Sequence, residues 1–280
     1  MSLSLEVQDI SGREKFQKIL NREKIPLFWE GDSINGTLII NPNNDVLKPK
    51  GALISLVGIF HTSDNETPLN ITQSDTIQVE LPNKIEQKLS IDFTIPSIKP
   101  QNSSFYGHSY YFEYYIVAKL RRRIVSDLSF SLPITIIPKP KPISSQNDPW
   151  IINLPPDVLN LTITLDKSFY TPFDILNGEI FLNTTPSSKN KSISISIVMS
   201  EKFNNQSTEY PLCKYQILDE TPPSGIKAPF LLQLDRMHLI PFTSHQSIPF
   251  QVNYNIDFIV KFPNNQNVYH EYSFPIYITP

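Results

Sequence analysis

The sequence predicts an all-β protein built from two similar antiparallel β-sandwiches in tandem. The first observation is an internal repeat: the segment 174–180 (Asp-Ile-Leu-Asn-Gly-Glu-Ile) lies 142 positions after the segment 32–38 (Asp-Ser-Ile-Asn-Gly-Thr-Leu). Two further pairs of segments, 114–120 with 256–262 and 131–136 with 273–278, match at the same separation. A repeat of this length has the size of a domain and is far longer than a solenoid unit.

The second observation is the distribution of proline. The chain has 280 residues, among them 25 prolines and 8 glycines, and prolines at short intervals interrupt helices. Between them, apolar and polar residues alternate at 53–60 and 192–199, which predicts strands with one buried and one solvated face. Aromatic-rich segments at 110–120 and 250–262 predict central strands.

These elements group into two domains. We expect an N-terminal sandwich over residues 1–138, a linker at 139–149 and a C-terminal sandwich over 150–280, with roughly seven or eight strands in each sandwich. Alternate prolines in the linker favour a stiff, extended spacer. The one helix candidate, 13–21, is short and charged, and it fits a loop equally well.

Gly36 and Gly178 occupy equivalent places in the repeat, and each follows an asparagine. Asn-Gly is a common hairpin dipeptide, but β-forming residues follow both glycines directly. We therefore expect each glycine at a bulge or at a close approach within a strand.

Charge and composition exclude several classes of function. The formal net charge is −3 and the pI is about 6.0, so nucleic acid is not expected as a partner. The single cysteine, Cys213, excludes an internal disulfide, fits a reducing compartment and is expected to be a small, partly buried apolar residue. The N-terminus lacks a signal-peptide pattern, and no apolar run reaches the ~18 residues of a membrane span. A cytoplasmic protein is expected.

The sequence contains no recognisable catalytic or metal-binding motif. It has no nucleophile elbow, no glycine-rich phosphate loop and no His-Glu-x-x-His pattern. The five histidines are scattered, and the spacing of His238 and His245 fits no standard zinc site. We therefore expect no catalytic residue, metal or cofactor, and a binding protein rather than an enzyme. A structural sandwich or a hydrolase with a dispersed site is the alternative, which a screen for esterase, phosphatase and glycosidase turnover would reveal.

Three consecutive arginines, Arg121, Arg122 and Arg123, end a predicted strand just before a turn at Ser126 and Asp127. One interpretation is a solvated cluster that guards a sheet edge. The other is a contact surface for an anionic partner, either lipid head groups or an acidic peptide.

Four stretches in order along the chain are similar to motifs of one known family. They are 28–36, then 90–95 with 105–107 and 114–117, then 122–128, and finally 214–219 with 222–225 and 228–232. The most specific is Lys214-Tyr215-Gln216-Ile217-Leu218-Asp219, similar to the family's Lys-Tyr-Glu-Ile-Met-Asp-Gly. Over about residues 25–280 the chain resembles the vacuolar protein sorting 26 family, the arrestin-like subunit of retromer.

This resemblance implies two arrestin-like sandwiches and a non-catalytic scaffold. It implies that the C-terminal sandwich binds the helical solenoid subunit of retromer, and that sorting nexins and cargo tails bind near the domain junction. The complex serves retrieval from endosomes to the Golgi or plasma membrane, so the chain would be peripheral to endosomal membranes. When the family's solenoid contact is carried over to the matching positions of this sequence, it falls on a loop with Tyr215, Ile217, Leu218 and Asp219.

A second loop with Pro241 and Phe242 is a further candidate for the same surface. The residues alone favour a role for Ile217 and Leu218 in closing the end of the sandwich, although adjacent residues on a strand would leave one of them pointing outward. The resemblance reverses this preference in favour of the solenoid contact. Glu220 stands where the family has glycine, so this turn is expected to differ. The chain also stops at the last predicted strand, without the longer tail of some members.

Two related adaptors are alternatives. Retriever has its own arrestin-like subunit with the same fold. An α-arrestin that recruits ubiquitin ligases would carry Pro-Pro-x-Tyr, but neither Pro155-Pro156-Asp157-Val158 nor Pro222-Pro223-Ser224-Gly225 has tyrosine at the fourth place.

Overall fold

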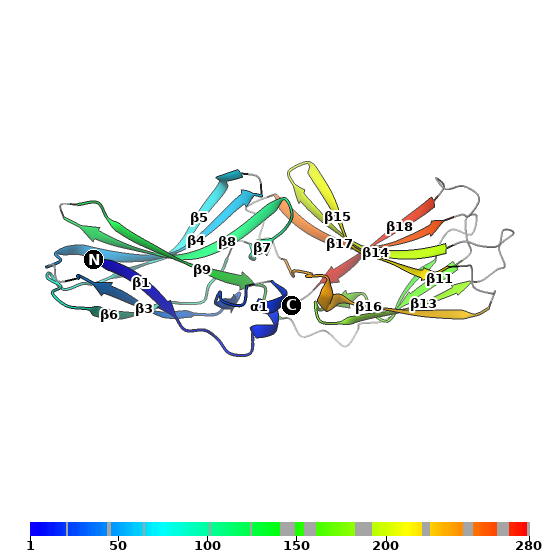
Figure 1. The fold of residues 1–280 in the computed structure, drawn as a ribbon, viewed down its shortest axis with the longest axis horizontal. Coiled ribbons are helices and arrows are strands. Elements are labelled where there is room, and N and C mark those ends of the chain that lie inside the picture. The colour runs from blue at the N-terminus through cyan, green and yellow to red at the C-terminus, as the bar shows by residue number, and fades with distance from the viewer. Residues whose placement is uncertain are drawn as a thin grey trace. The chain divides into compact units, whose positions relative to one another are not determined.

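The computed structural model covers residues 1–280 and shows an all-β protein (Figure 1). It describes residues 1–20, 22–43, 46–63, 65–100, 102–123, 125–140, 149–153, 161–182, 192–219, 225–242, 249–261 and 269–278. The chain divides into two compact units. Unit 1 is Met1–Lys139 with Phe242–Ser247, and unit 2 is Pro140–Pro241 with Ile248–Pro280. Most of the expected proline-rich linker lies outside the described residues.

Unit 1 consists of two sheets packed face to face (Figure 1). The smaller sheet has the order β1 (Ser2–Val7), β3 (Ile34–Asn41), β6 (Leu89–Ile95). The larger has the order β2 (Leu27–Trp29), β9 (Leu128–Ile137), β8 (Tyr110–Arg122), β4 (Pro49–Thr62), β5 (Asn65–Val79), with β7 (Phe105–Tyr106) paired to β8. The segment that fitted a helix or a loop contains a short helix, α1 (Glu14–Ile19), with Glu14 in its first turn and Lys18 in its last, as the helix dipole favours.

Unit 2 repeats this plan. Its first sheet has the order β10 (Trp150–Asn153), β11 (Leu161–Leu165), β13 (Ile175–Leu182), β16 (Lys227–Gln233). Its second has the order β12 (Phe169–Tyr170), β18 (Tyr269–Ile278), β17 (Phe250–Lys261), β14 (Ser192–Phe203), β15 (Gln206–Leu218). A 3-10 turn, η1 (Leu234–Arg236), follows β16. The prediction of two arrestin-like antiparallel sandwiches is confirmed.

Strand order shows how closely the two units correspond. The orders β1-β3-β6 and β2-β9-β8-β4-β5 of unit 1 match β11-β13-β16 and β12-β18-β17-β14-β15 of unit 2. In each unit the short strand β2 or β12 runs parallel to its neighbour, whereas all other pairs of strands within the sheets are antiparallel. Among the described residues, β10 has no counterpart in unit 1. The repeat found in the sequence is therefore a repeat of topology.

The two glycines of the repeat lie beneath aromatic rings from the neighbouring strand. Gly36 is opposite Phe93, and Gly178 is opposite Phe230. A Cβ atom would lie 2.6 Å from the Phe93 ring at position 36 and 2.3 Å from the Phe230 ring at position 178. Pairing runs without a register shift past both glycines. Of the two expected explanations, the close approach is confirmed and the bulge is not.

The aspartates of the repeat also have equivalent contacts. Asp32 accepts the Trp29 backbone N–H at 2.7 Å and pairs with Arg13 at 2.6 Å. Asp174 accepts the Thr171 N–H at 2.7 Å and pairs with Lys167 at 2.6 Å. Each cation also lies over an aromatic ring of the same turn: Arg13 is 5.1 Å from the Trp29 ring and Lys167 is 5.1 Å from the Tyr170 ring. One charge-assisted turn thus precedes β3 in unit 1 and β13 in unit 2.

We expect Asp174→Asn to destabilise unit 2 by about 1 kcal/mol at neutral pH, because it removes the ion pair with Lys167 but retains an acceptor for Thr171. Burial alone raises the pKa of Asp174, but the Lys167 ammonium and the Thr171 N–H outweigh it, and the pKa lies below its usual value. A lowered pKa stabilises the fold above the unfolded-state pKa, and this contribution is lost as pH falls through the folded-state pKa. Urea unfolding should show the difference between wild type and variant shrinking on acidification, and a constant difference would contradict it.

One expectation for a strand face is wrong. Ile193, Ile195 and Ile197 are buried as expected, but Ser194 and Ser196 on the opposite face are also buried, with 5% and 4% of their surface exposed. β14 is a central strand, so each of these short serine side chains has a paired strand, β15 or β17, on either side. The Ser196 hydroxyl donates to the Cys213 carbonyl at 2.7 Å.

Candidate functional site

A groove with a volume of about 950 Å³ opens on unit 2 between the edge strands of its two sheets. We call it the edge groove. It is lined from β15 by Tyr215, Gln216 and Ile217, from β16 and the residues after it by Pro229, Phe230, Leu231, Leu232, Gln233 and Arg236, and from the remaining strands and loops by Pro149, Thr164, Asp166, Asn177, Gly178 and Glu179. All of these residues belong to unit 2.

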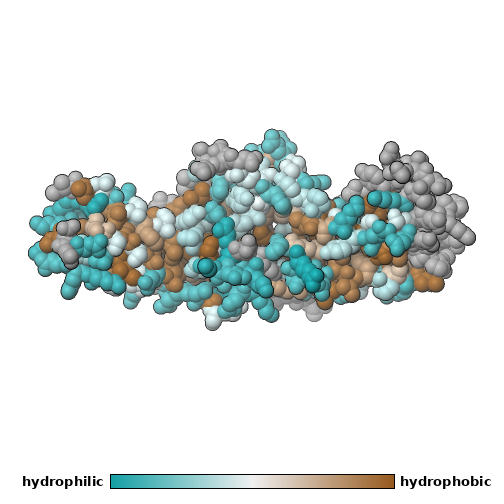
Figure 2. All heavy atoms as spheres, in the orientation of Figure 1, coloured by the Kyte–Doolittle hydropathy of each residue, from teal (hydrophilic) through white to brown (hydrophobic). Residues whose placement is uncertain are grey.

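Apolar side chains in the edge groove are unusually exposed. Leu231 has 63% of its surface accessible and Tyr215 has 47%, and the Phe230 ring is half-buried. Figure 2 shows apolar side chains reaching the surface of unit 2 along the margin where β16 runs. Contiguous exposed apolar groups of this kind typically mark a binding surface.

The structure corrects the expected conformation around Ile217. Tyr215, Ile217 and Leu218 lie on the edge strand β15 rather than in a loop. The partner of Ile193 is Leu218 and the partner of Ser194 is Gln216, so Ile217 is the extra residue of a β-bulge. The bulge breaks strict alternation. Neither Ile217 nor Leu218 points fully outward, and both are half-buried.

Asp219 directly follows β15 and is exposed. Its carboxylate accepts a hydrogen bond from the Gln216 side chain at 2.6 Å, across the bulge. This contact fixes the end of the strand beside Ile217. The expected effect of Glu220 on the following turn concerns a residue outside the described part of the chain.

Pro241 and Phe242 do not line the edge groove. Pro241 is buried. The Phe242 ring packs against Phe105 in an edge-to-face contact with a centroid distance of 5.5 Å, and Phe242 belongs to unit 1. The preceding backbone is fixed by the buried Tyr254 hydroxyl, which accepts from the Ile240 N–H at 3.0 Å and donates to the Ile240 carbonyl at 3.1 Å. Of the six candidate partner-binding residues, the groove brings together Tyr215 and Ile217, with Leu218 and Asp219 adjacent in sequence.

Sequence reasoning missed the wall of the groove formed by β16. Phe230, Leu231 and Leu232 read as an ordinary apolar strand. Leu232 is indeed buried, but Leu231 is exposed and Phe230 is half-buried at the edge of the sheet. The available signal was the glycine at position 178. A glycine within a strand leaves space for a large side chain on the neighbouring strand. Here that side chain is Phe230.

The three arginines have different surroundings. The Arg122 guanidinium donates to the Ser126 carbonyl, with Nε at 2.6 Å, and the Arg122 backbone N–H donates to the Asp127 carboxylate at 3.2 Å. This N–H is the main reason that the pKa of Asp127 lies below its usual value. Arg121 and Arg123 are exposed. Arg122 thus holds the turn between β8 and β9.

Two observations on the described residues concern metal binding and thiol reactivity. Among them, no three His, Cys, Asp or Glu side chains are placed to bind one metal ion. Cys213 is half-buried with its Sγ 3.6 Å from the Met237 sulfur, and burial raises the pKa of its thiol, so the reactive thiolate is disfavoured. In the part of the chain that the structure describes, no helix is long and apolar enough to span a membrane.

Two antiparallel β-sandwiches in tandem define an arrestin-like protein. The model of the protein family described as "Vacuolar protein sorting-associated protein 26" matches residues 5–264, and the chain belongs to this family. The family consists of retromer-type, non-catalytic subunits of protein-sorting complexes that act at endosomal or vacuolar membranes. The resemblance inferred from the sequence is confirmed.

Individual relatives are distant but similar over most of their length. The chain is 25% identical over 251 residues to vacuolar protein sorting-associated protein 26B of Xenopus tropicalis, covering 85% of this chain and 72% of the relative. The human 26B protein is 24% identical over 252 residues, with the same coverage. The protein 26 of Plasmodium falciparum is 23% identical over 276 residues, covering 92% of this chain and 89% of the relative.

Proposed function

We propose that the chain is the arrestin-like scaffold subunit of a retromer complex and that it binds the helical solenoid subunit through the edge groove of unit 2. In this complex it helps to select cargo for retrieval from endosomes, together with sorting nexins, and reaches the membrane as a peripheral component. The single observation that supports the docking site is the overlap of two features. Tyr215 and Ile217, which match the family's solenoid-binding motif by position, line the exposed apolar groove between β15 and β16.

The physical chemistry of the groove suits a helical partner. Apolar side chains from two strand edges flank a groove that can accept the apolar ridge of a helical repeat. Glu179, Asp166 and Arg236 lie among the lining residues and can form polar contacts around an apolar centre. An exposed Tyr such as Tyr215 is a residue type that often dominates binding energy at interfaces.

Calorimetric titration against the N-terminal helical repeats of the organism's retromer solenoid subunit tests this function. We expect saturable one-to-one binding by the full chain. The corresponding repeats of the retriever solenoid are the matched comparison, because the arrestin-like subunits of both complexes share a fold. Binding to the retriever solenoid alone would overturn the retromer assignment, and binding to neither by a folded chain would overturn the scaffold assignment.

A further inference from the structure

The end of unit 1 that contains the β8–β9 turn carries exposed cations. Arg121 lies at the end of β8 and Arg123 directly after it, whereas Lys50 lies at the start of β4 and Lys48 directly before it. Strand pairing brings these segments together: Pro49 is opposite Arg122 and Gly51 is opposite Arg121, so Lys50 is the extra residue of a bulge beside the arginines. Residues distant in sequence thus form one basic surface.

The carboxylates that the structure describes at this end of unit 1 neutralise this surface only in part. Asp127 is engaged by Lys119 at 3.3 Å and by the Arg122 backbone N–H. Glu86 is engaged by Lys84. Glu80, exposed just after β5, is a further carboxylate at this end. Within the described residues, Lys48, Lys50, Arg121 and Arg123 form no ion pair with any of these three.

Two apolar side chains extend beyond the cations. The paired segments separate at Pro49 and Arg122, and Val46 and Val125 each lie three positions beyond that pair. Val46 has 52% of its surface exposed and Val125 has 57%. Figure 2 shows this end of unit 1 as mostly hydrophilic, with single apolar side chains between the polar ones. We call Val46, Lys48, Lys50, Arg121, Arg123 and Val125 the basic tip.

We propose that the basic tip is a binding site for an anionic membrane surface. Cations at the end of a sheet attract acidic head groups, and the two valines can enter the interfacial layer without displacing any core side chain. The protein as a whole carries a net charge of −3, so this attraction is local rather than general. An acidic peptide would satisfy the cations but would leave both valines in water, and we therefore favour the lipid surface. This site is separate from the edge groove and does not depend on solenoid binding.

The turn itself is held by Arg122 and Lys119, which leaves the other cations available. Arg122 contacts Ser126 and Asp127, and Lys119 contacts Asp127. These contacts fix the backbone around Val125 in advance, so little conformational entropy is lost on binding. Arg121 and Arg123 can therefore be altered while the contacts that shape the turn remain.

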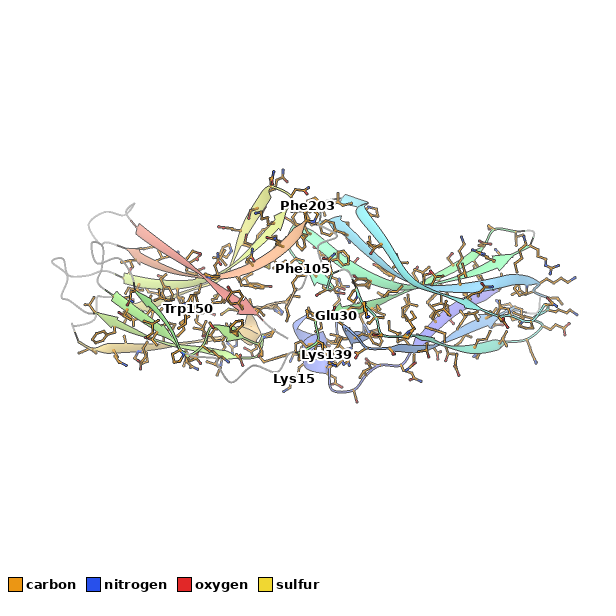
Figure 3. All side chains as sticks on the ribbon, turned by 180° about the vertical axis from the view of Figure 1, so that it is seen from behind. Lys15, Glu30, Phe105, Lys139, Trp150 and Phe203 are labelled. Carbon is orange, nitrogen blue, oxygen red and sulfur yellow. The ribbon has the colours of Figure 1, made fainter. Side chains whose placement is uncertain are left out.

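The test measures co-sedimentation of the full chain with vesicles of pure phosphatidylcholine and of phosphatidylcholine mixed with phosphatidylserine. We expect binding to the anionic vesicles alone, weakening as salt is added. Arg121→Glu/Arg123→Glu should lower the partition coefficient by at least about 25-fold, since one cation near an acidic leaflet contributes about fivefold. The matched control, Lys15→Glu/Lys18→Glu, makes the same change in net charge on α1, where both side chains are exposed and Figure 3 shows Lys15 at the surface.

Unchanged vesicle binding by the arginine variant, or an equal loss in the α1 control, would overturn the proposal. Val125→Asn distinguishes membrane binding from peptide binding, because it keeps every charge and removes one apolar side chain. It should weaken vesicle binding a few-fold. The wild type could instead fail to bind vesicles but bind a polyglutamate peptide, with Val125→Asn leaving peptide binding unchanged. In that case the basic tip recognises acidic protein and the proposal is wrong.

Discussion

The double substitution Ile217→Asp/Leu218→Asn is expected to abolish binding to the retromer solenoid, raising the Kd by more than about a hundredfold. Both side chains are half-buried at the bulged end of the edge strand β15, and Ile217 lines the edge groove. A partner that covers this groove would enclose the new carboxylate beside the apolar side chains of the groove, and removing a charge from water in such surroundings is costly. Titration of both forms against the same helical repeats measures the change.

A matched control separates lost contacts from a damaged strand. Leu212 is also half-buried and is the extra residue at the other bulge of β15, where the pairing shifts from Cys213 to Pro211. It does not line the edge groove. Leu212→Asn should therefore disturb β15 to a similar extent while leaving solenoid binding close to that of the wild type. Equal losses in the two variants, or a large fall in the melting temperature of the double variant, would contradict a direct role of Ile217 and Leu218.

The repeated architecture could be predicted because each unit carries the same local signals. The aspartate that caps the turn before β3 or β13 and the glycine beneath an aromatic ring depend on short-range geometry, so they leave a pattern at a fixed separation. Because these local patterns recur in the same order in both halves of the chain, they predict that the two units share one strand topology. The sequence could not identify Phe230 as the partner of Gly178, because strand pairing depends on contacts between distant residues.

The candidate site was predicted in part, and the misses have physical causes. The alternation of apolar and polar residues assigns each strand residue to one face of the sheet. One inserted residue reverses this assignment for all residues beyond it, and the sequence pattern does not reveal the bulge at Ile217. Phe242 was assigned to the same surface from its place in the chain, whereas its ring packs on Phe105 in unit 1. The basic tip was visible only as three arginines. Strand pairing places Lys50 beside the arginines. The Arg122 side chain is bound to the Ser126 carbonyl of the turn, so it is not counted among the proposed lipid-binding residues.

Gly178→Val is expected to lower the stability of unit 2 by about 2–3 kcal/mol, seen as a fall in its melting temperature of roughly 5–10 °C. The backbone at Gly178 is ordinary, so the cost comes from space alone. A Cβ atom there would lie 2.3 Å from Cζ and 2.6 Å from Cε1 of Phe230, whose ring also packs edge-to-face on Phe258 with a centroid distance of 6.2 Å. Valine therefore forces the ring away from Phe258 and toward the groove.

A second substitution in each unit shows whether the ring is the obstacle. Phe230→Ala removes the ring, so adding Gly178→Val to it should cost much less than in the wild type, and the two changes should be strongly non-additive. At the equivalent Gly36, a Cβ would also lie 2.6 Å from the Glu6 backbone oxygen, which cannot rotate away. Gly36→Val should consequently cost more, and Phe93→Ala should rescue it poorly. Additive effects of Gly178→Val and Phe230→Ala would mean that the ring moves freely, and the wall of the edge groove would then be adaptable rather than preformed.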